Sequence, residues 1–261
     1  QGITAGAGVV ISRAVVRDLY DGAPAQRLMS QISMMFALAP AIAPVIGGWL
    51  QTLFGWRSVF AFLVLSTAAL WLACWKFLPE TLPPEKRKSL QPAYLGRTYW
   101  KVMPSPPFLL ACAALSLNFA GFFIYVLSAP VFLMKHLGVH ETGFLWLFGP
   151  AMAGLMGGSW LSGQLAGKIT MSRTIALGYL VMSSAVLGNV SLNLVLPPAL
   201  PWSVMPLFIY TLGMSLAMPS LTILALDPFP EQRGLAASCQ TFFPSGFNSL
   251  AAALIAPALW G

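Results

Sequence analysis

The residue types that most often carry out chemistry are scarce in this sequence and lie outside its apolar segments. Among 261 residues there are seven acids and two histidines. The acids all fall at the ends of uncharged segments or between them: Asp18, Asp21, Glu80, Glu85, Glu141, Asp227 and Glu231. We find no phosphate-binding loop and no convincing spacing of catalytic groups. We therefore expect no catalytic residues, no cofactor and no enzymatic activity.

A metal site is also not expected. His136, His140 and Glu141 form an H-x-x-x-H-E cluster that would bind a metal if it were helical. Gly138 lies inside the cluster, and we predict that the segment is an external surface loop. The three cysteines are far apart in apolar surroundings and lack a C-x-x-C spacing. We interpret them as packing residues.

Two copies of the pattern D-x-x-P-x-Q-R are the first candidate site. They run from Asp21 to Arg27 and from Asp227 to Arg233, each between an inward-running and an outward-running segment. This shared polarity favours an internal repeat. Helix capping would explain each copy, because proline at a helix start needs no donor and a carboxylate suits the positive end of the helix dipole. The alternative is a cytoplasmic gate of charges that exchange partners between two bundles, formed by Arg17, Asp18, Asp21, Arg27, Asp227 and Arg233.

The second candidate site is a polar position inside the uncharged segment 102–134. Asn118 is followed by Phe122 and Tyr125 at helical spacing, so the three share one helix face. Opposing candidates lie in the second half of segment 174–226: Tyr210, Met214 and Met218. Methionine and aromatic side chains can repack around varied amphipathic ligands, which favours a substrate pocket. A stripe of this kind is also typical of core packing.

Composition identifies an integral membrane protein. The sequence is 57% hydrophobic and 8% charged, whereas soluble domains carry about 25% charged residues. The uncharged segments are 1–12, 28–56, 58–75, 102–134, 142–167, 174–226 and 234–261. Segment 174–226 is too long for one crossing, and the prolines between 197 and 201 divide it into two. We therefore predict an all-α protein with eight spans, the first of them truncated.

The positive charges predict the orientation of these spans. With alternate loops assigned to opposite sides, twelve of the fourteen lysines and arginines fall on one side. That side is predicted to be cytoplasmic, so the net charge of +7 reflects topology and not nucleic-acid binding. The long polar segment 80–106 lies on this side. Its aromatic and basic residues suit a short helix on the inner headgroup layer, although a plain linker between two bundles is equally consistent.

Small residues dominate one face of the second span. Pro40, Pro44, Gly47 and Gly48 recur at three- and four-residue intervals with alanines between them. They would allow close approach of another helix and weaken the local hydrogen-bond ladder. A second set of small-x-x-x-small pairs, which we also assign to helix packing, lies between Gly154 and Gly167.

These segments resemble motifs of one transporter family. The stretch from Ala37 to Gly48, followed by Gly55-Trp56-Arg57, resembles the antiporter motif in the fifth helix of major facilitator superfamily exporters. The segment Arg13 to Asp18 resembles the end of helix four in the Bcr/CflA branch of drug/proton antiporters. Residues 163–173 resemble a degenerate copy of the superfamily's cytoplasmic loop motif, with Gly167 in place of the acid.

The resemblance implies a two-bundle major facilitator fold of which about eight of twelve helices, helix four to helix eleven, are present. We then expect the end of the N-terminal bundle at 1–79, a cytoplasmic linker at 80–106 and the C-terminal bundle at 107–261. Three helices would precede residue 1, and one would follow residue 261. Helices seven and ten line the central cavity in this superfamily, which favours the pocket interpretation of Asn118 and Tyr210.

The implied function is proton-coupled efflux of small amphipathic drugs across the bacterial inner membrane by alternating access. The partners would be drug, protons and the lipid bilayer, the energy source would be the proton gradient, and the protein would be a monomer. Because no span contains a carboxylate, we expect the proton carrier in the absent first helix. Export of polar metabolites such as sugars or nucleosides, or a fragment without transport activity, are the alternatives.

The predicted topology can be tested by labelling single cysteines in the full-length protein in intact cells. A cysteine at Pro198 should react with a membrane-impermeant reagent from outside, whereas one at Ser89 should react only after permeabilisation. The opposite pattern would reverse the predicted orientation.

Overall fold

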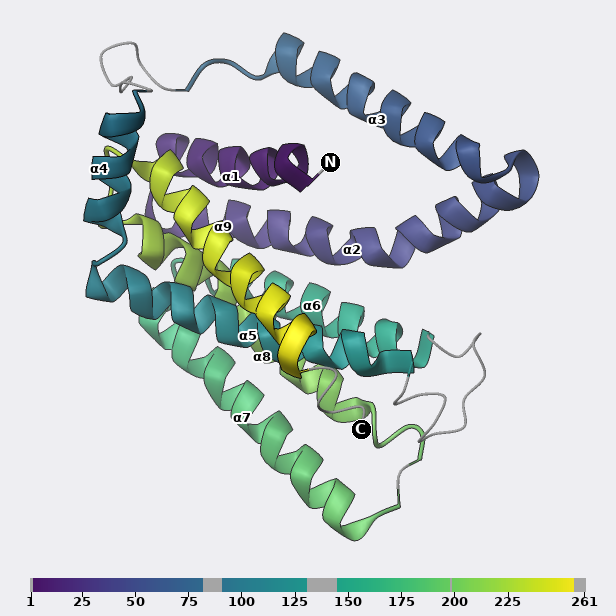
Figure 1. The fold of residues 1–261 in the computed structure, drawn as a ribbon. Coiled ribbons are helices and arrows are strands. Elements are labelled where there is room, and N and C mark those ends of the chain that lie inside the picture. Colours follow the sequence, from purple (N-terminus) through teal and green to yellow (C-terminus); the bar gives the residue numbers. More distant parts are fainter. Residues whose placement is uncertain (1, 82–90, 131–144, 198, 256–261) are drawn as a thin grey trace.

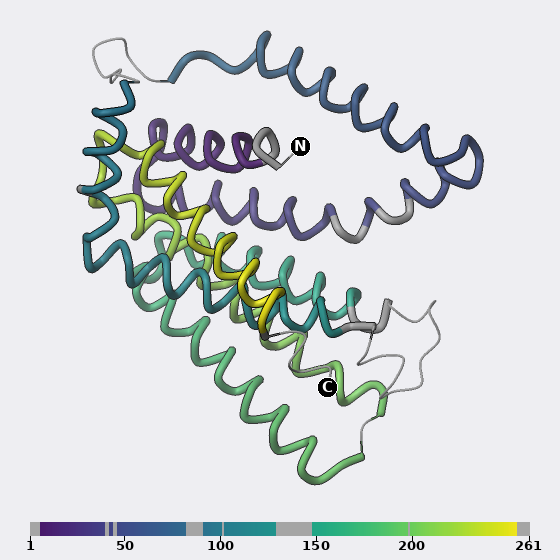
Figure 2. Tube along the Cα trace, in the orientation of Figure 1, coloured from purple at the N-terminus to yellow at the C-terminus, as the bar shows by residue number. Residues whose placement is uncertain are grey.

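The protein is all-α over residues 2–81, 91–130, 145–197 and 199–255, the part of the chain that the computed structural model describes (Figure 2). Each of the eight predicted spans contains a helix. The elements are α1 (Gly2–Leu19), α2 (Gly22–Phe54), α3 (Trp56–Phe77), α4 (Pro92–Val102), α5 (Pro106–Pro130), α6 (Leu145–Leu165), α7 (Met171–Val195), α8 (Met205–Leu226), α9 (Arg233–Leu250) and the π-helical turn η4 (Ala251–Ile255).

Glycine and proline set the helix boundaries much as the sequence predicts. Gly55 ends α2 with a φ of 77°, a left-handed conformation that side chains disfavour, and α3 starts at the next residue. The prolines near position 200 separate α7 from α8, which confirms the predicted break in segment 174–226. The second span is longer than predicted, because α2 extends back to Gly22.

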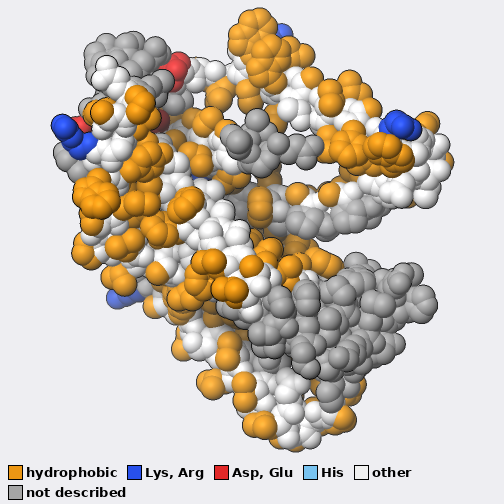
Figure 3. Space-filling model, in the orientation of Figure 1, with side chains coloured by type: hydrophobic (Ala, Val, Ile, Leu, Met, Phe, Trp, Pro, Cys, Tyr) orange, Lys and Arg blue, Asp and Glu red, His pale blue; other side chains and the backbone are white. Residues whose placement is uncertain are grey.

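Four of the described helices are long and apolar enough to cross a membrane: α3, residues 106–128 of α5, α7 and α8. The other predicted spans, α1, α2, α6 and α9, are also helical. Apolar side chains cover much of the visible surface, including α3 (Figure 3), which has no buried residue. In water this surface would be unfavourable, so the structure is that of a multi-pass membrane protein.

The helices form two groups that meet at one end (Figure 1). α5, α6, α7 and α9 surround or flank α8, most of whose residues are buried. α1 and α2 lie against this group at the end where α4 is found, and α2 and α3 diverge from it toward the other end (Figure 1). By the predicted topology the closed end is cytoplasmic. This grouping matches the two bundles expected from the sequence, although the bundle boundaries themselves stay a prediction.

Glycines bring α6 and α7 close to α8. A Cβ on Gly158 would collide with the backbone carbonyl of Leu212, and a Cβ on Gly178 would lie 2.7 Å from the carbonyl oxygen of Gly213. Backbone contact of this kind replaces the hydrophobic driving force that is largely absent between helices in lipid. The predicted packing role of the small residues in α6 is confirmed at Gly154 and Gly158.

The small-residue face of α2 differs from this. The chain is helical through Pro40 and Pro44, but no described residue lies within 4 Å of a Cβ built on Gly47 or Gly48. The close helix contact predicted there has no partner among the described residues. It therefore stays a prediction.

The predicted linker contains a helix. α4 is amphipathic, with Val102 buried and Trp100 80% exposed, and the hydroxyl of Tyr99 lies 3.0 Å from that of Ser238 on α9. The interpretation of 80–106 as a plain linker is therefore incomplete. Whether α4 lies in the headgroup layer stays a prediction.

The close packing of α6 on α8 leads to a stability prediction. Gly158→Leu should lower the free energy of unfolding by about 1–3 kcal/mol or more, because the new side chain meets backbone. Thermal unfolding of the full-length protein in detergent measures this effect. Gly188→Leu on α7 is the matched control, since nothing lies within 4 Å of its Cβ position. Equal melting temperatures for both variants would contradict the packing argument.

Candidate functional site

The two D-x-x-P-x-Q-R copies meet in space and form a charge cluster between the two helix groups. Arg17, near the end of α1, makes a hydrogen-bonded ion pair with Asp227, which follows α8. The two residues are 210 positions apart in the chain. The side chain of Arg17 is only 5% exposed, so its charge is compensated by protein groups instead of water.

Further ion pairs in the cluster involve arginines from both helix groups. Arg17 also binds Asp21 within its own group, with Nη1 3.1 Å from Oδ1. From α9, Arg233 lies 3.7 Å from Asp18 and 3.6 Å from Asp21, measured from guanidinium nitrogen to carboxylate oxygen. Arg233 also donates a hydrogen bond to the backbone carbonyl of Arg17. Asp21 is therefore shared between an arginine of its own group and one of the opposite group.

Helix capping does not account for this arrangement. Asp21 occupies the N-cap position of α2 without a side-chain capping hydrogen bond. Asp227 follows the last residue of α8, and the N-cap of α9 is Gln232. The expectation that each proline marks a helix start was wrong for the second copy, because Pro230 precedes α9 by three residues. The carboxylates bind arginines instead, as in the gate interpretation.

Arg27 does not belong to the cluster. It lies on α2 beside α6, where its Nη2 donates to the carbonyl of Ala166 at 3.3 Å, and the neighbouring Gln26 donates to the carbonyl of Ser162 at 3.4 Å. Arg27 therefore makes no ion pair with the described members of the charge cluster, and its predicted role in the cytoplasmic gate stays a prediction. Arg27 has the same position in the repeat as Arg233, but it lies on the face of α2 that meets α6.

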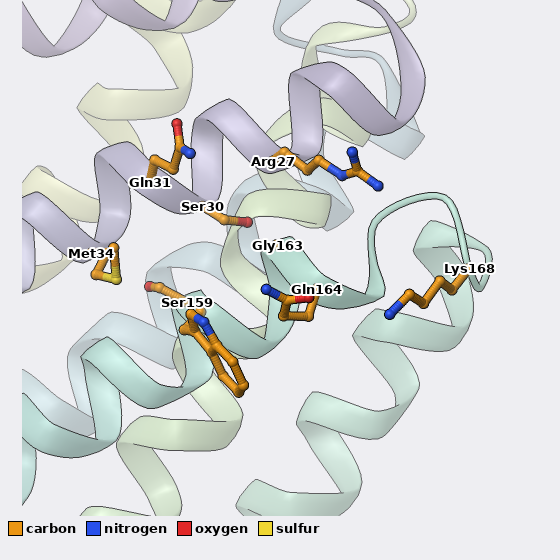
Figure 4. Close-up of a pocket in the computed structure, with 9 residues that line it drawn as sticks. Arg27, Ser30, Gln31, Met34, Ser159, Gly163, Gln164 and Lys168 are labelled. Carbon is orange, nitrogen blue, oxygen red and sulfur yellow. The ribbon is translucent and has the colours of Figure 1, made fainter.

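A cavity of about 490 Å³ opens where α2 and α6 meet (Figure 4). Its lining includes Arg27, Ser30 and Gln31 from α2, Ser159 and Gln164 from α6, and Lys168 just after α6. Sequence reasoning missed this site. The available signal was polar residues at helical spacing in both α2 and α6, but nothing in the sequence shows that these two faces meet.

The predicted substrate residues also come together. Phe122 and Met214 are buried in one cluster, against which Tyr125, Tyr210 and Met218 pack. The hydroxyl of Tyr210 donates to the backbone carbonyl of Asn118 at 3.0 Å, and that of Tyr125 donates to the carbonyl of Ser203 at 3.1 Å. The contact of α5 with α8 predicted from spacing is thus present. In this conformation the side chains of the cluster leave little space between them, as in an ordinary hydrophobic core.

Two features distinguish this cluster from ordinary core. Asn118 is 2% exposed. Its amide nitrogen makes no hydrogen bond of normal geometry among the described residues, and the Tyr179 hydroxyl faces its side chain. A buried donor with so weak a partner is unfavourable, and a ligand acceptor would satisfy it better. Tyr125 and Tyr210 line a cavity of about 160 Å³ between α5, α7 and α8. That volume is below the roughly 300–1,000 Å³ of typical small-molecule sites.

The described residues contain no group of three metal-binding side chains. The H-x-x-x-H-E cluster at 136–141 lies outside the described residues. Of the three free cysteines, Cys74 is exposed, whereas Cys112 and Cys239 are buried.

A family model described as Major Facilitator Superfamily matches residues 1–255. An uncharacterised MFS-type transporter of Bacillus subtilis, YdgK, is 27% identical over 98% of this chain and 64% of its own length. A bicyclomycin resistance protein homolog of Haemophilus influenzae is 30% identical over 65% of this chain and 42% of its own length. Multidrug resistance protein D of Escherichia coli is 25% identical over 90% of this chain and 58% of its own length.

The chain therefore spans between two fifths and two thirds of the length of these three relatives.

The charge cluster leads to a prediction about opening of the closed end. Ala25 on α2 is fully buried beside Ile223 of α8, so a cysteine there should react slowly with a soluble thiol reagent. Asp227→Asn removes a charged hydrogen bond worth about 1.5–3 kcal/mol, and we expect labelling of Ala25→Cys to become about tenfold faster or more.

The labelling rate should be measured in the full-length protein with the native cysteines replaced by alanine. Asp227→Glu keeps the charge and should label at nearly the parental rate. An unchanged rate in Asp227→Asn would mean that the cluster does not hold this end closed.

Proposed function

The chain belongs to the major facilitator superfamily, a family of transporters and not enzymes, and from that premise we propose that the protein exports small amphipathic drugs in exchange for protons by alternating access. The observation that carries the mechanism is the ion pair of Arg17 with Asp227 across the two helix groups. The names of the relatives from Haemophilus influenzae and Escherichia coli support drugs as the substrate class. The resemblance to drug/proton antiporters supports proton coupling.

In this proposal the charge cluster is the cytoplasmic gate. When the gate opens, Arg17 loses Asp227 but keeps Asp21, which lies in its own helix group. A buried arginine left without any carboxylate would be strongly unfavourable, whereas one that changes partners is not. Asp227 is already 41% exposed, so water can replace the lost partner. The shared acid therefore keeps the two gate states close in free energy, as alternating access requires.

The cluster around Asn118 is the proposed substrate site. Its amide nitrogen supplies one polar anchor, and Phe122, Tyr125, Tyr210, Met214 and Met218 supply a soft apolar wall. Because thioether and aromatic side chains adapt to different shapes, such a wall suits chemically varied drugs better than one polar metabolite. The present cavity is too small for a drug, so binding requires that α5 and α8 separate in another state of the transport cycle.

Proton coupling does not use a buried acid of the described spans. The described carboxylates lie near helix ends or between helices, and three of them belong to the charge cluster. We therefore place the proton carrier outside the described residues, as the resemblance implies.

The proposal is tested with the full-length protein reconstituted into vesicles that carry a pH gradient. Addition of an amphipathic drug should release the gradient, and the gradient should drive drug movement. Drug movement without proton movement would exclude antiport, and absence of both with a metabolite carried instead would exclude drug export.

The proposed substrate site generates a specific prediction. Asn118→Ala removes one hydrogen-bond donor, so we expect about 2–10-fold weaker binding of drugs with a matching acceptor and little change for drugs without one. Ser116→Ala on the same helix is the matched control, because Ser116 is buried but bonds to the carbonyl of Cys112. Binding measured for a panel of drugs, with protein abundance recorded for each variant, checks the expectation. An equal loss of binding for all drugs in both variants would mean that Asn118 does not contact the drug.

A further inference from the structure

The closed end of the molecule has two contact regions between the helix groups, and they differ in charge. Where α1 meets α9, three carboxylates and two arginines compensate one another. Where α2 meets α6, the cavity of about 490 Å³ is lined by two cations, Arg27 and Lys168, and by no acid. The second contact region therefore has a net positive charge and space beside it.

The two cations come from opposite helix groups and are not neutralised by described residues. Neither Arg27 nor Lys168 forms an ion pair within the described part of the chain. Arg27 makes one hydrogen bond, to the carbonyl of Ala166, and a guanidinium has five donors. Gly167 packs against Ala23, where a Cβ would lie 3.0 Å from that of Ala23, and its φ of 81° disfavours a side chain. The chain has no room at that position for an acid of its own.

The cavity is polar at one end and apolar beyond it. Arg27 and Lys168 lie at the same end in Figure 4, and Met34 lies toward the other. Trp160 also lines the cavity, and it is 56% exposed. Next to Met34, the side chains of Met35 and Phe36 are exposed on α2 as well. A cationic end beside an apolar surface at the predicted cytoplasmic face matches the headgroup and chains of a phospholipid, whereas a free phosphate would use only the cationic end.

We propose that this cavity binds the phosphate headgroup of an anionic phospholipid from the cytoplasmic leaflet. The phosphate lies between Arg27 and Lys168, with the amide of Gln164 as a further donor, and the acyl chains pass Met34 and Trp160. Because Arg27 and Lys168 belong to opposite helix groups, the lipid connects them across α2 and α6 as the charge cluster does across α1 and α9. It thereby favours the closed cytoplasmic end.

The effect on closure rests on the proposed gate, but lipid binding does not depend on which compound is exported. A protein that fails to transport drug could still bind the lipid, and a drug exporter could fail to bind it. The two proposals therefore fail separately.

The experiment uses the full-length protein in nanodiscs of phosphatidylcholine with or without phosphatidylglycerol. Native mass spectrometry of protein released from them counts retained lipids. We expect wild type to retain phosphatidylglycerol preferentially, with the preference falling about fivefold for each of Arg27→Gln and Lys168→Gln. Arg173→Gln is the matched control, because Arg173 is exposed near the same end but does not line the cavity. Phosphatidylglycerol should also slow labelling of Ala25→Cys in wild type but not in the double variant.

Two results would overturn the proposal. The first is equal retention of phosphatidylglycerol by wild type and the double variant. The second is a rise in melting temperature with inorganic phosphate in detergent that equals the rise with phosphatidylglycerol, which would identify a soluble anion as the ligand.

Discussion

The guanidinium of Arg17 is almost excluded from solvent, and the closed end of the molecule is built around its compensation. A charge removed from water is tolerable only when it is paired and hydrogen-bonded. Asp21 comes from the same helix group and Asp227 from the other, so the chain must return after more than two hundred residues to complete the site. That requirement fixes how α1, α2, α8 and α9 meet. Arg233 adds a second bond in the reverse direction, so that each group places an arginine against the other.

Behind this cluster, α8 provides the rigid support. Glycines on α6 and α7 allow backbone contact with α8 at Leu212 and Gly213, and such contacts do not deform easily because no flexible side chain separates the helices. α2 is different. It leaves the charge cluster, crosses α6 and then has open space around Gly47 and Gly48. Movement of α1 and α2 as a body against the α8 group would separate Ala25 and Met29 from Ile223 and α2 from α6. It would therefore disturb contacts near the closed end, but no described contact at Gly47 and Gly48.

The sequence predicted the class, the helix positions and most of the charge cluster, because these follow from local signals. Uncharged segments, prolines and Gly55 define the helices, and the repeated pattern identified Asp21, Asp227 and Arg233. Arg17 lies just before the first copy and was included with them in the predicted gate. What it could not predict depends on helix rotation. Arg27 was assigned to the gate together with Arg233, yet α2 directs it to α6 and not to the ion pairs around Arg17. The cavity between α2 and α6 was missed for the same reason, and the pairing of Asn118 with Tyr210 gave no information on how far the site is packed shut.

The two contact regions between the helix groups are physically different kinds of connection. The charge cluster consists of side chains of the protein itself. Its contribution to closure changes only when the helix groups separate or the carboxylates change partner. No described residue that lines the basic cavity at α2 and α6 is an acid, so in the lipid proposal its contribution depends on what the surrounding leaflet contains. In the two proposals, the charge cluster makes opening possible through the shared Asp21, and lipid in the basic cavity sets how often opening occurs. A transporter with this arrangement would respond to the composition of its membrane without any change in the residues that contact substrate.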